Sequence, residues 1–236
     1  MNKSHNFPDC WHCKARFKSV FCDLNEETLT QLDSQKGCSL YKKGQFIFNE
    51  GSYSHGLYCV NSGKIKIVQT GETGKEHIIR LVKEGDIIGY SSLLSGERYS
   101  CSAITLEESS VCFISKTFFF SLVTTNMNLA VKMIHLLINE LKMTEQKLIG
   151  MAQKPVRERF AEAILFLKEV YGCGTDNNTL NISLSREELA SIVGTARETA
   201  TRLLSEFKED RIVEVNGKKI RITDNQKLIK TANLQD

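Results

Sequence analysis

The sequence predicts an α+β fold in which a β-rich domain, one long helix and a small helical domain follow one another along 236 residues. Between residues 40 and 115, glycines recur between short β-rich runs such as "GLYCV" and "KIKIV". Residues 126–153 then contain no proline and carry apolar residues at helical spacing. Near the C-terminus, two short helical patterns are joined by a turn that contains glycine. A chain of this length holds one large domain or two ordinary ones.

The composition is typical of a globular protein, with 41% hydrophobic and 25% charged residues. The sequence shows neither a signal peptide nor an apolar run long enough to span a membrane, so we expect a cytoplasmic protein without a membrane partner. The formal net charge of +3 permits binding to nucleic acid but does not indicate it. A Walker A sequence, an HExxH motif, a nucleophile elbow and paired carboxylates are all missing from the sequence, which argues against an enzyme.

The N-terminal arm, residues 1–24, contains three closely spaced cysteines, Cys10, Cys13 and Cys22. In a reducing compartment, cysteines are more often free thiols or metal ligands than disulfides, and a Cys-x-x-Cys sequence fits either of these roles. Four further cysteines are spread singly along the chain, and we interpret them as core or surface thiols. They are Cys38, Cys59, Cys101 and Cys173.

Residues 25–125 are predicted to form a β-sandwich or jelly roll. A short helix over 25–35 comes first, with Leu29 and Leu32 on one side. The runs that follow are short, rich in β-branched and aromatic residues, and separated by turn glycines, as strands of such a sandwich are.

Residues 126–153 are predicted to form a dimerisation helix. Its apolar stripe alternates spacings of three and four, which is the pattern of a coiled-coil seam. The stripe comprises Met127, Ala130, Ile134, Leu137, Leu141, Thr144, Leu148 and Met151. The alternative is a helix that packs on its own β-domain, but a stripe this long and narrow suits a partner helix. We therefore expect a homodimer whose interface includes Ile134, Leu137, Leu141, Thr144, Leu148 and Met151.

Residues 154–236 contain a helix-turn-helix pattern. Pro155 fits the first turn of the helix "VRERFAEAILFLKEVYG". Further on, Ser185 with Glu188 predicts a capping box at the start of a short helix that ends at Gly194. Thr195 followed by Glu198 predicts a second capping box, which would open the next helix. Two helices joined by so tight a turn form a helix-turn-helix.

The second helix of this pair starts with polar residues that suit DNA recognition. Arginine can bond bidentately to guanine, and glutamate can accept from cytosine. The residues on the first turns, where such a helix meets base edges, are Arg197, Glu198, Thr199, Thr201 and Arg202. The alternative is a solvated face on which Glu198 only caps the helix, but within a helix-turn-helix we favour DNA binding.

A wing is predicted to follow the helix-turn-helix. Asn216-Gly217 is the preferred turn of a two-residue hairpin. Its Lys218, Lys219 and Arg221 are expected to reach DNA phosphates.

The order of jelly roll, long helix and winged helix-turn-helix resembles the Crp/Fnr family of bacterial transcription regulators. The strongest matches are "KKGQFIFNEG", "GLYCVNSGKIKIV", "SAITLEESSVCFI" and "LSREELASIVGTARETATRLLSEFKEDRI". The resemblance implies a cyclic-nucleotide-binding-like sensor domain and a homodimer on a palindromic operator in double-stranded DNA. It also implies contact with RNA polymerase. Arg197, Glu198 and Arg202 match the family's base-reading positions, and Arg197 is similar to the Crp branch, which implies a half-site closer to TGTGA than to TTGAT.

The phosphate cassette of the family's cyclic-nucleotide binders is not preserved here. Tyr90 stands where a ribose-binding Glu is expected, and Tyr99 where a phosphate-binding Arg is expected. Arg98 is one position away, which in a strand places it on the other face. A buried phosphate without its Arg would lose a charge-assisted bond of about 1.5–3 kcal/mol. Cyclic AMP is therefore not the expected effector.

The Fnr branch carries an oxygen-labile 4Fe-4S cluster on three N-terminal cysteines and one that follows a Leu-Glu-x-Ser-x-Val run. The sequence "LEESSVC" ends at Cys112, so the resemblance implies Cys10, Cys13, Cys22 and Cys112 as cluster ligands and sensing of oxygen, nitric oxide or redox state. Cys22 follows Cys13 by nine positions, three more than the family spacing.

Two alternatives to the cluster stay open. One is a regulator without a metal, which responds to another small ligand or is constitutively active. The other is zinc on the three arm cysteines with either His12 or Cys112. Basic residues interleaved with the arm cysteines would favour thiolates in either metal site. They are Lys14, Arg16 and Lys18.

Overall fold

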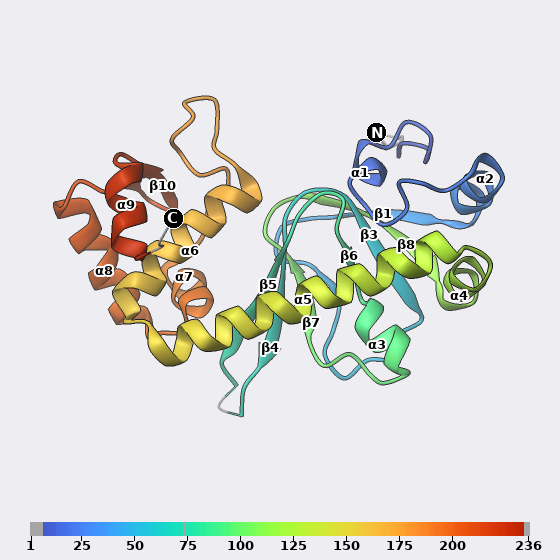
Figure 1. Ribbon diagram of the computed structural model, residues 1–236, viewed down its shortest axis with the longest axis horizontal. Helices are drawn as coiled ribbons and strands as arrows, with labels where there is room; N and C mark the ends of the chain where they lie inside the picture. Colours follow the sequence, from blue (N-terminus) through green and yellow to red (C-terminus); the bar gives the residue numbers. More distant parts are fainter. Residues whose placement is uncertain (1–6, 73, 234–236) are drawn as a thin grey trace. The chain divides into compact units, whose positions relative to one another are not determined.

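The computed structural model describes residues 7–72 and 74–233 (Figure 1). These residues form two compact units, which are described separately below. The first contains the β-rich part of the chain up to Glu140; the second begins at Leu141 and also takes in the short segment Glu76–Ile78. The outer ends of the predicted arm, residues 1–6, and of the predicted C-terminal domain, residues 234–236, lie outside the described residues.

Two four-stranded sheets form the centre of the first unit and confirm the predicted β-sandwich. One sheet has the order β1 (Gly37–Tyr41), β8 (Ser109–Ser115), β3 (Gly56–Ser62) and β6 (Ile87–Ile88). The other has the order β2 (Phe46–Phe48), β7 (Ser102–Thr105), β4 (Ile65–Thr70) and β5 (Glu76–Val82). Non-sequential neighbours, such as β8 between β1 and β3, are the crossings that distinguish a jelly roll from a simple meander.

The core of the sandwich consists of alternate residues that both sheets direct inward. Val60 of β3 and Val111 of β8 meet Ile65, Ile67 and Ala103 from the other sheet in one buried cluster. All five side chains are at most 5% exposed, so the inward face of each sheet is buried in this core.

Gly56 begins β3 at a point where the neighbouring strand leaves no room for a side chain. A Cβ atom there would lie 2.1 Å from the Ile114 carbonyl oxygen and 2.6 Å from the Phe113 ring. A backbone carbonyl oxygen cannot rotate away from this clash as a flexible side chain can. We therefore expect Gly56→Ala to lower the free energy of unfolding by about 1–3 kcal/mol. Thermal unfolding measures this as a Tm lower by roughly 2–4 °C per kcal/mol.

Gly37→Ala is the matched control, since Gly37 opens the strand β1 and a Cβ there meets nothing within 4 Å. We expect its Tm to stay within a degree or two of the wild type, as surface changes usually cost less than about 0.5 kcal/mol. Equal Tm losses in the two variants would contradict the steric explanation.

Helices cover the outer face of the sheet that contains β3 and β8. They are α1 (Lys14–Phe17), α2 (Glu26–Gln35), α3 (Tyr90–Ser95), α4 (Lys116–Thr125) and the first turns of α5 (Met127–Gln153). Leu29 and Leu32, which were predicted to share one side of α2, are buried there together with Leu129 and Met133 of α5. The Asn25 side chain accepts a hydrogen bond from the Thr28 amide at 2.9 Å and so caps α2.

The long helix α5 is continuous over the predicted range (Figure 1). Its buried residues, Leu129 and Met133, do not belong to the predicted stripe. Most of the stripe is exposed instead, and its exposed apolar members are Met127, Ile134, Leu137, Leu141, Leu148 and Met151.

Within residues 7–72 and 74–233, no single helix has the length and apolar character needed to cross a membrane. Among the same described residues, α4 and α5 taken together, bent by 109° at their junction, meet that test of length and composition.

The second unit contains α6 (Val156–Tyr171), α7 (Arg186–Val193), α8 (Arg197–Glu209), β9 (Val213–Asn216), β10 (Lys219–Ile222) and α9 (Asn225–Ala232). Its core includes Phe160 of α6 and Phe207 of α8, whose rings meet edge to face at 5.4 Å. The capping box of α7 is confirmed: the Ser185 hydroxyl accepts from the Glu188 amide at 3.1 Å, and the Glu188 carboxylate accepts from the Ser185 amide at 2.8 Å.

Two local predictions in this unit are wrong by one residue. The N-cap of α8 is Ala196, which has no side-chain acceptor, so the predicted capping box of Thr195 and Glu198 does not form. In the hairpin, Asn216 pairs with Lys219, which makes Gly217-Lys218 the turn instead of Asn216-Gly217. Gly217 takes a positive φ of 59° at the first turn position, as glycine does without strain. Lys218 is therefore the tip of the wing.

Candidate functional site

The helices α7 and α8 form a helix-turn-helix around a left-handed Gly194. Gly194 has φ 71° and ends α7, and the next amide, Thr195, donates to the Ala190 carbonyl at 3.0 Å. The facing residues are buried on both helices. They are Leu189, Ala190 and Val193 of α7 and Ala200, Leu203, Leu204 and Phe207 of α8. Packing of these faces leaves the opposite side of α8 to solvent.

The exposed face of α8 carries four of the five predicted base-reading residues, Arg197, Glu198, Thr201 and Arg202. Their spacing of i, i+1, i+4 and i+5 places them on one side of the helix. Thr199 is half-buried beside this face. The Thr201 hydroxyl donates to the Arg197 carbonyl at 2.8 Å, so in this state it is engaged with its own helix.

The two arginines of this face differ in their surroundings. Arg202 forms an ion pair with Glu206, which also accepts from Arg157 at 2.7 Å. Arg197 forms no ion pair with any residue in the part of the chain that the structure describes. Its guanidinium is thus available to a ligand without the loss of an existing partner.

Arg197 also lines an open hollow with the start of α7 and the tip of the wing. The other lining residues are Ser185, Arg186, Glu187, Gly217 and Lys218. Three basic side chains from three elements therefore surround this hollow, beside the exposed Lys219 of β10. Positive side chains beside a helix N-terminus suit a DNA phosphate. Arg186 was not among the predicted DNA-contacting residues, although its place directly after the cap Ser185 is a signal for such a role.

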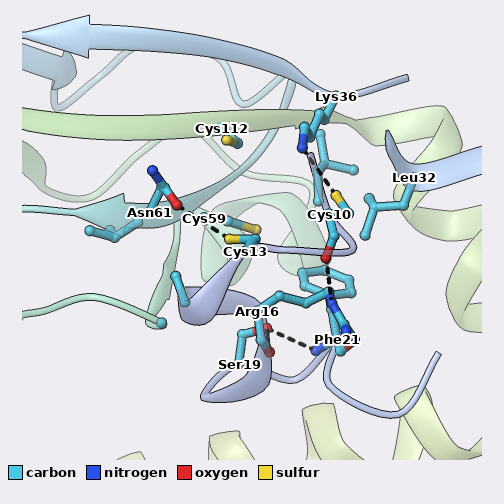
Figure 2. Close-up of a pocket in the computed structure, with 14 residues that line it drawn as sticks. Cys10, Cys13, Arg16, Ser19, Phe21, Leu32, Lys36, Cys59, Asn61 and Cys112 are labelled. Carbon is cyan, nitrogen blue, oxygen red and sulfur yellow. Dashed lines mark hydrogen bonds between the residues drawn. The ribbon is translucent and has the colours of Figure 1, made fainter. Parts of the chain in front are cut away.

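A second site lies where the N-terminal arm crosses the outer face of β3 and β8. Four cysteines, Cys10, Cys13, Cys59 and Cys112, line one small cavity there (Figure 2). Its volume of about 40 Å³ is enough for only a few water molecules.

Cys112 forms a disulfide with Cys38, and their Cα atoms are 4.0 Å apart. The register of β1 and β8 makes these two residues direct partners, whose side chains leave the sheet on the same face. This corrects two predictions, because Cys38 is not a single thiol and Cys112 is not a free ligand in this state.

The arm is held over the cavity by polar contacts. The Cys10 amide donates to Asp33 at 2.7 Å, and the Cys13 thiol donates to Asn61 at 3.2 Å. The Lys36 ammonium lies 3.2 Å from the Cys10 sulfur and 2.8 Å from Asp33. Burial raises the pKa of the Cys10 thiol against the opposing effect of Lys36, and burial also raises the pKa of Cys59.

Cys22 lies outside this cavity. Its sulfur accepts a hydrogen bond from Lys132 of α5 at 2.7 Å, and Lys132 also forms an ion pair with Asp23. Thus Lys36 and Lys132 contact the arm thiols. Lys14, Arg16 and Lys18 were expected to favour thiolates. Of these, Arg16 donates to the backbone carbonyls of Cys10 and Cys22, and Lys18 pairs with Glu84.

The four predicted ligands do not fit a 4Fe-4S cluster in this arrangement. Cys22 is separated from the other three, the Cys112 sulfur is already bonded, and the cavity is too small. The zinc alternative with His12 does not assemble either, since His12 binds Asp9 at 2.9 Å on the surface. Among the described residues, no three His, Cys, Asp or Glu side chains are placed to hold a metal ion.

Aromatic residues stand at the two positions where the resemblance implied a ribose-binding Glu and a phosphate-binding Arg, Tyr90 and Tyr99. Tyr99 is buried and stacks on Phe48 with ring centroids 4.0 Å apart, and burial raises its pKa. Arg98 points to the other side, as the strand alternation predicted, and donates to the Tyr53 hydroxyl at 2.8 Å. The Tyr90 hydroxyl accepts from Arg80 at 2.9 Å.

Two family models match the two units of the chain. The cyclic nucleotide-binding domain matches residues 39–126, and the Crp-like helix-turn-helix domain matches residues 158–231. Among curated proteins, the fumarate and nitrate reduction regulatory protein of Escherichia coli is 30% identical over 226 residues, 94% of this chain and 90% of that protein. The transcriptional activator protein Anr of Pseudomonas protegens is 27% identical over 225 residues, 94% of this chain and 91% of that protein.

Solved structures share the fold over nearly their whole length. The c-di-GMP responsive global regulator CLP of Xanthomonas campestris has a TM-score of 0.74 at 20% identity, covering 85% of this chain and 100% of that one. A transcriptional regulator from Eubacterium rectale has a TM-score of 0.74 at 19% identity, covering 91% of this chain and 98% of that one. At these identities the likeness establishes the architecture alone.

Proposed function

Because the chain belongs to the Crp/Fnr family of DNA-binding transcription regulators, which are not enzymes, we propose that it binds palindromic operators as a cytoplasmic homodimer and recruits RNA polymerase. The observation that supports operator binding is the exposed face of α8 beside the wing. Arg197 and Glu198 lie at the start of the second helix, where a helix-turn-helix meets base edges. Lys218 and Lys219 lie where a wing would meet phosphates.

Dimerisation through α5 is supported by the apolar stripe that stays exposed within one chain. Leu141 is 58% exposed and Leu148 is 68% exposed. Monomeric proteins rarely expose so many large apolar side chains on one element, and a second copy of α5 offers the same stripe in return. Two copies joined in this way would present two recognition helices to the two halves of a palindrome.

The proposed signal is oxygen, nitric oxide or redox state, sensed through cysteines of the arm and Cys112. Two observations support it. One curated relative, from Pasteurella multocida, is named anaerobic regulatory protein, and one from Escherichia coli is named fumarate and nitrate reduction regulatory protein. Two arm thiols, Cys10 and Cys13, line the cavity on the face of the sheet that carries Cys112. An iron–sulfur cluster bound to such thiols would supply an oxygen-sensitive redox centre. Cyclic AMP is not proposed as the effector, because Tyr99 fills the position of the phosphate-binding Arg.

The second candidate is a Crp/Fnr-type regulator without a metal, which responds to another small ligand or is constitutively active. The Cys38–Cys112 disulfide favours it, since this bond removes one of the four expected ligands.

Purification without air tests the signal. We expect a coloured protein that contains iron and acid-labile sulfide, and whose operator affinity falls on exposure to air by about 5- to 150-fold, the usual range of allosteric coupling. A colourless, iron-free protein with the same operator affinity in both conditions would support the second candidate. Neither result would contradict the proposal that the protein binds an operator.

A further inference from the structure

We propose that Glu206 is a specificity-determining residue of the DNA-binding unit, because its carboxylate holds Arg202 away from DNA that offers no matching base. Arg157 of α6 is the positioning residue through which Glu206 releases Arg202 on the operator. This inference rests on the operator binding through α8 proposed above. Neither Glu206 nor Arg157 belongs to the predicted base-reading residues.

The Glu206 carboxylate is shared between two arginines. Its Oε1 atom forms an ion pair with Arg202, which lies one turn earlier on α8, and its Oε2 atom accepts from Arg157 at 2.7 Å. The Arg202 side chain is 64% exposed and the Arg157 side chain is 39% exposed. Arg202 is therefore the partner that DNA can withdraw from the carboxylate, while Arg157 stays behind.

Two further contacts fix Arg157 beside α8. Its second terminal nitrogen binds Asp210 at 2.5 Å, and its guanidinium carbon lies 4.9 Å from the centre of the buried Phe207 ring. Glu206 and Asp210 are four residues apart, so one planar guanidinium bridges two successive turns of the helix. Arg157 can therefore keep its place when Arg202 turns toward DNA.

Glu206 competes with DNA for the guanidinium of Arg202. A guanine in the operator offers two acceptors to an arginine and so replaces what Arg202 loses when it leaves Glu206. On unrelated DNA the phosphates offer only an exchange of one anionic partner for another, which gains little. Arg202 thus stays paired with Glu206 on unrelated DNA and contacts a base on the operator, which widens the difference between the two affinities.

Arg157 makes the release of Arg202 less costly. While Arg157 is present, the Glu206 carboxylate keeps a charged hydrogen bond after Arg202 has left. Without Arg157, the departure of Arg202 would leave this carboxylate unpaired beside the negative charge of DNA. Arg157 therefore acts on DNA affinity through Glu206, and its effect disappears once residue 206 carries no charge.

The first test compares wild type with Glu206→Gln. An operator is selected from a pool of random duplexes by repeated rounds of binding to the wild-type protein. Affinities for this operator and for unrelated DNA are then measured over a range of salt concentrations. We expect Glu206→Gln to raise operator affinity by about two- to fivefold, as loss of an exposed ion pair allows. Its affinity for unrelated DNA should rise by more, with a slope of log affinity against log salt steeper by about one.

Glu209→Gln is the matched control for this test. The substitution removes the same charge from an exposed position on the same helix, and Glu209 forms no ion pair with any of the described residues. We expect the control to keep both affinities and the salt slope of the wild type. Thermal unfolding checks that each variant is folded.

Arg157→Met tests the positioning role, because methionine keeps an apolar stem over Phe207 but cannot form either ion pair. We expect it to lower operator affinity by about two- to tenfold in the wild-type background and to have no effect when combined with Glu206→Gln, as a double-mutant cycle measures. If Arg157→Met unfolds, Arg157→Lys replaces it with the same expected pattern, since lysine keeps the charge but lacks the planar fork. A loss of equal size in both backgrounds would contradict action through Glu206.

The outcomes separate this inference from the proposed function. Equal gains of Glu206→Gln on the operator and on unrelated DNA, unchanged affinities for both, or the same result as with Glu209→Gln would overturn the role of Glu206 and leave operator binding intact. A selection that yields no preferred sequence would overturn both the inference and the proposed function.

Discussion

Replacing Arg197 with alanine is expected to weaken binding to the operator by roughly 5- to 150-fold per half-site. Arg197 is exposed on the first turn of α8 and forms no ion pair among residues 7–72 and 74–233, so its whole bonding capacity is available to a base. A bidentate contact between arginine and guanine discriminates by about 1–3 kcal/mol. Arg202 must first leave Glu206, so Arg202→Ala is expected to cost less.

The affinity of each protein is measured at one salt concentration for three DNAs: an operator that has TGTGA half-sites, an operator that has TTGAT half-sites, and unrelated DNA. Lys208→Ala is the matched control, because this substitution also removes one positive charge, but from the exposed far end of α8. Lys218→Ala at the wing tip is expected to weaken all three DNAs alike and to lower the salt slope by about one. An Arg197→Ala protein that keeps both affinity and sequence preference would refute the proposed recognition helix.

Replacing Leu148 with glutamate is expected to convert the dimer to a monomer and to abolish tight operator binding. Leu148 is 68% exposed within one chain, so its apolar surface becomes buried only against a partner. A symmetric interface loses two leucines at about 1.5–3 kcal/mol each and gains two desolvated carboxylates, which raises the dimer dissociation constant by more than about a hundredfold. Sedimentation equilibrium and operator titration measure the two effects.

Gln146→Glu places the same charge on the same helix outside the stripe, at a position that is also exposed. We expect this control to remain dimeric with unchanged operator affinity. If Leu148→Glu also remains dimeric at micromolar concentrations, the stripe of α5 is not the interface.

Much of the fold could be predicted from local patterns in the sequence. The extent of α5, the capping box of Ser185 and Glu188, and the sandwich with its turn glycines all depend on spacings within a few residues. Backbone geometry imposes these spacings, with a period of 3.6 in helices and 2 in strands. The errors at the start of α8 and in the wing turn were shifts of one residue, because several neighbouring residues suit a cap or a turn and tertiary packing selects among them.

The cysteine site could be predicted only in part. Of the four cysteines that the resemblance implied as ligands, Cys10, Cys13 and Cys112 line one cavity and Cys22 does not. Neither the bond from Cys112 to Cys38 nor the place of Cys59 beside them has a signal in the local sequence. Both follow from the register of β8 with β1 and β3, strands that lie far from it along the chain.

The order of the elements, the exposed polar residues at the start of α8 and the apolar stripe of α5 follow from the amino-acid sequence, since each depends on a short repeat and on side-chain chemistry. Which thiols meet depends on strand register and on the path of the arm, because a shift of one residue in either would turn a cysteine to the opposite face of the sheet. The folded chain alone therefore shows that Cys22 lies against Lys132 of α5, while Cys59 lies with Cys10, Cys13 and Cys112.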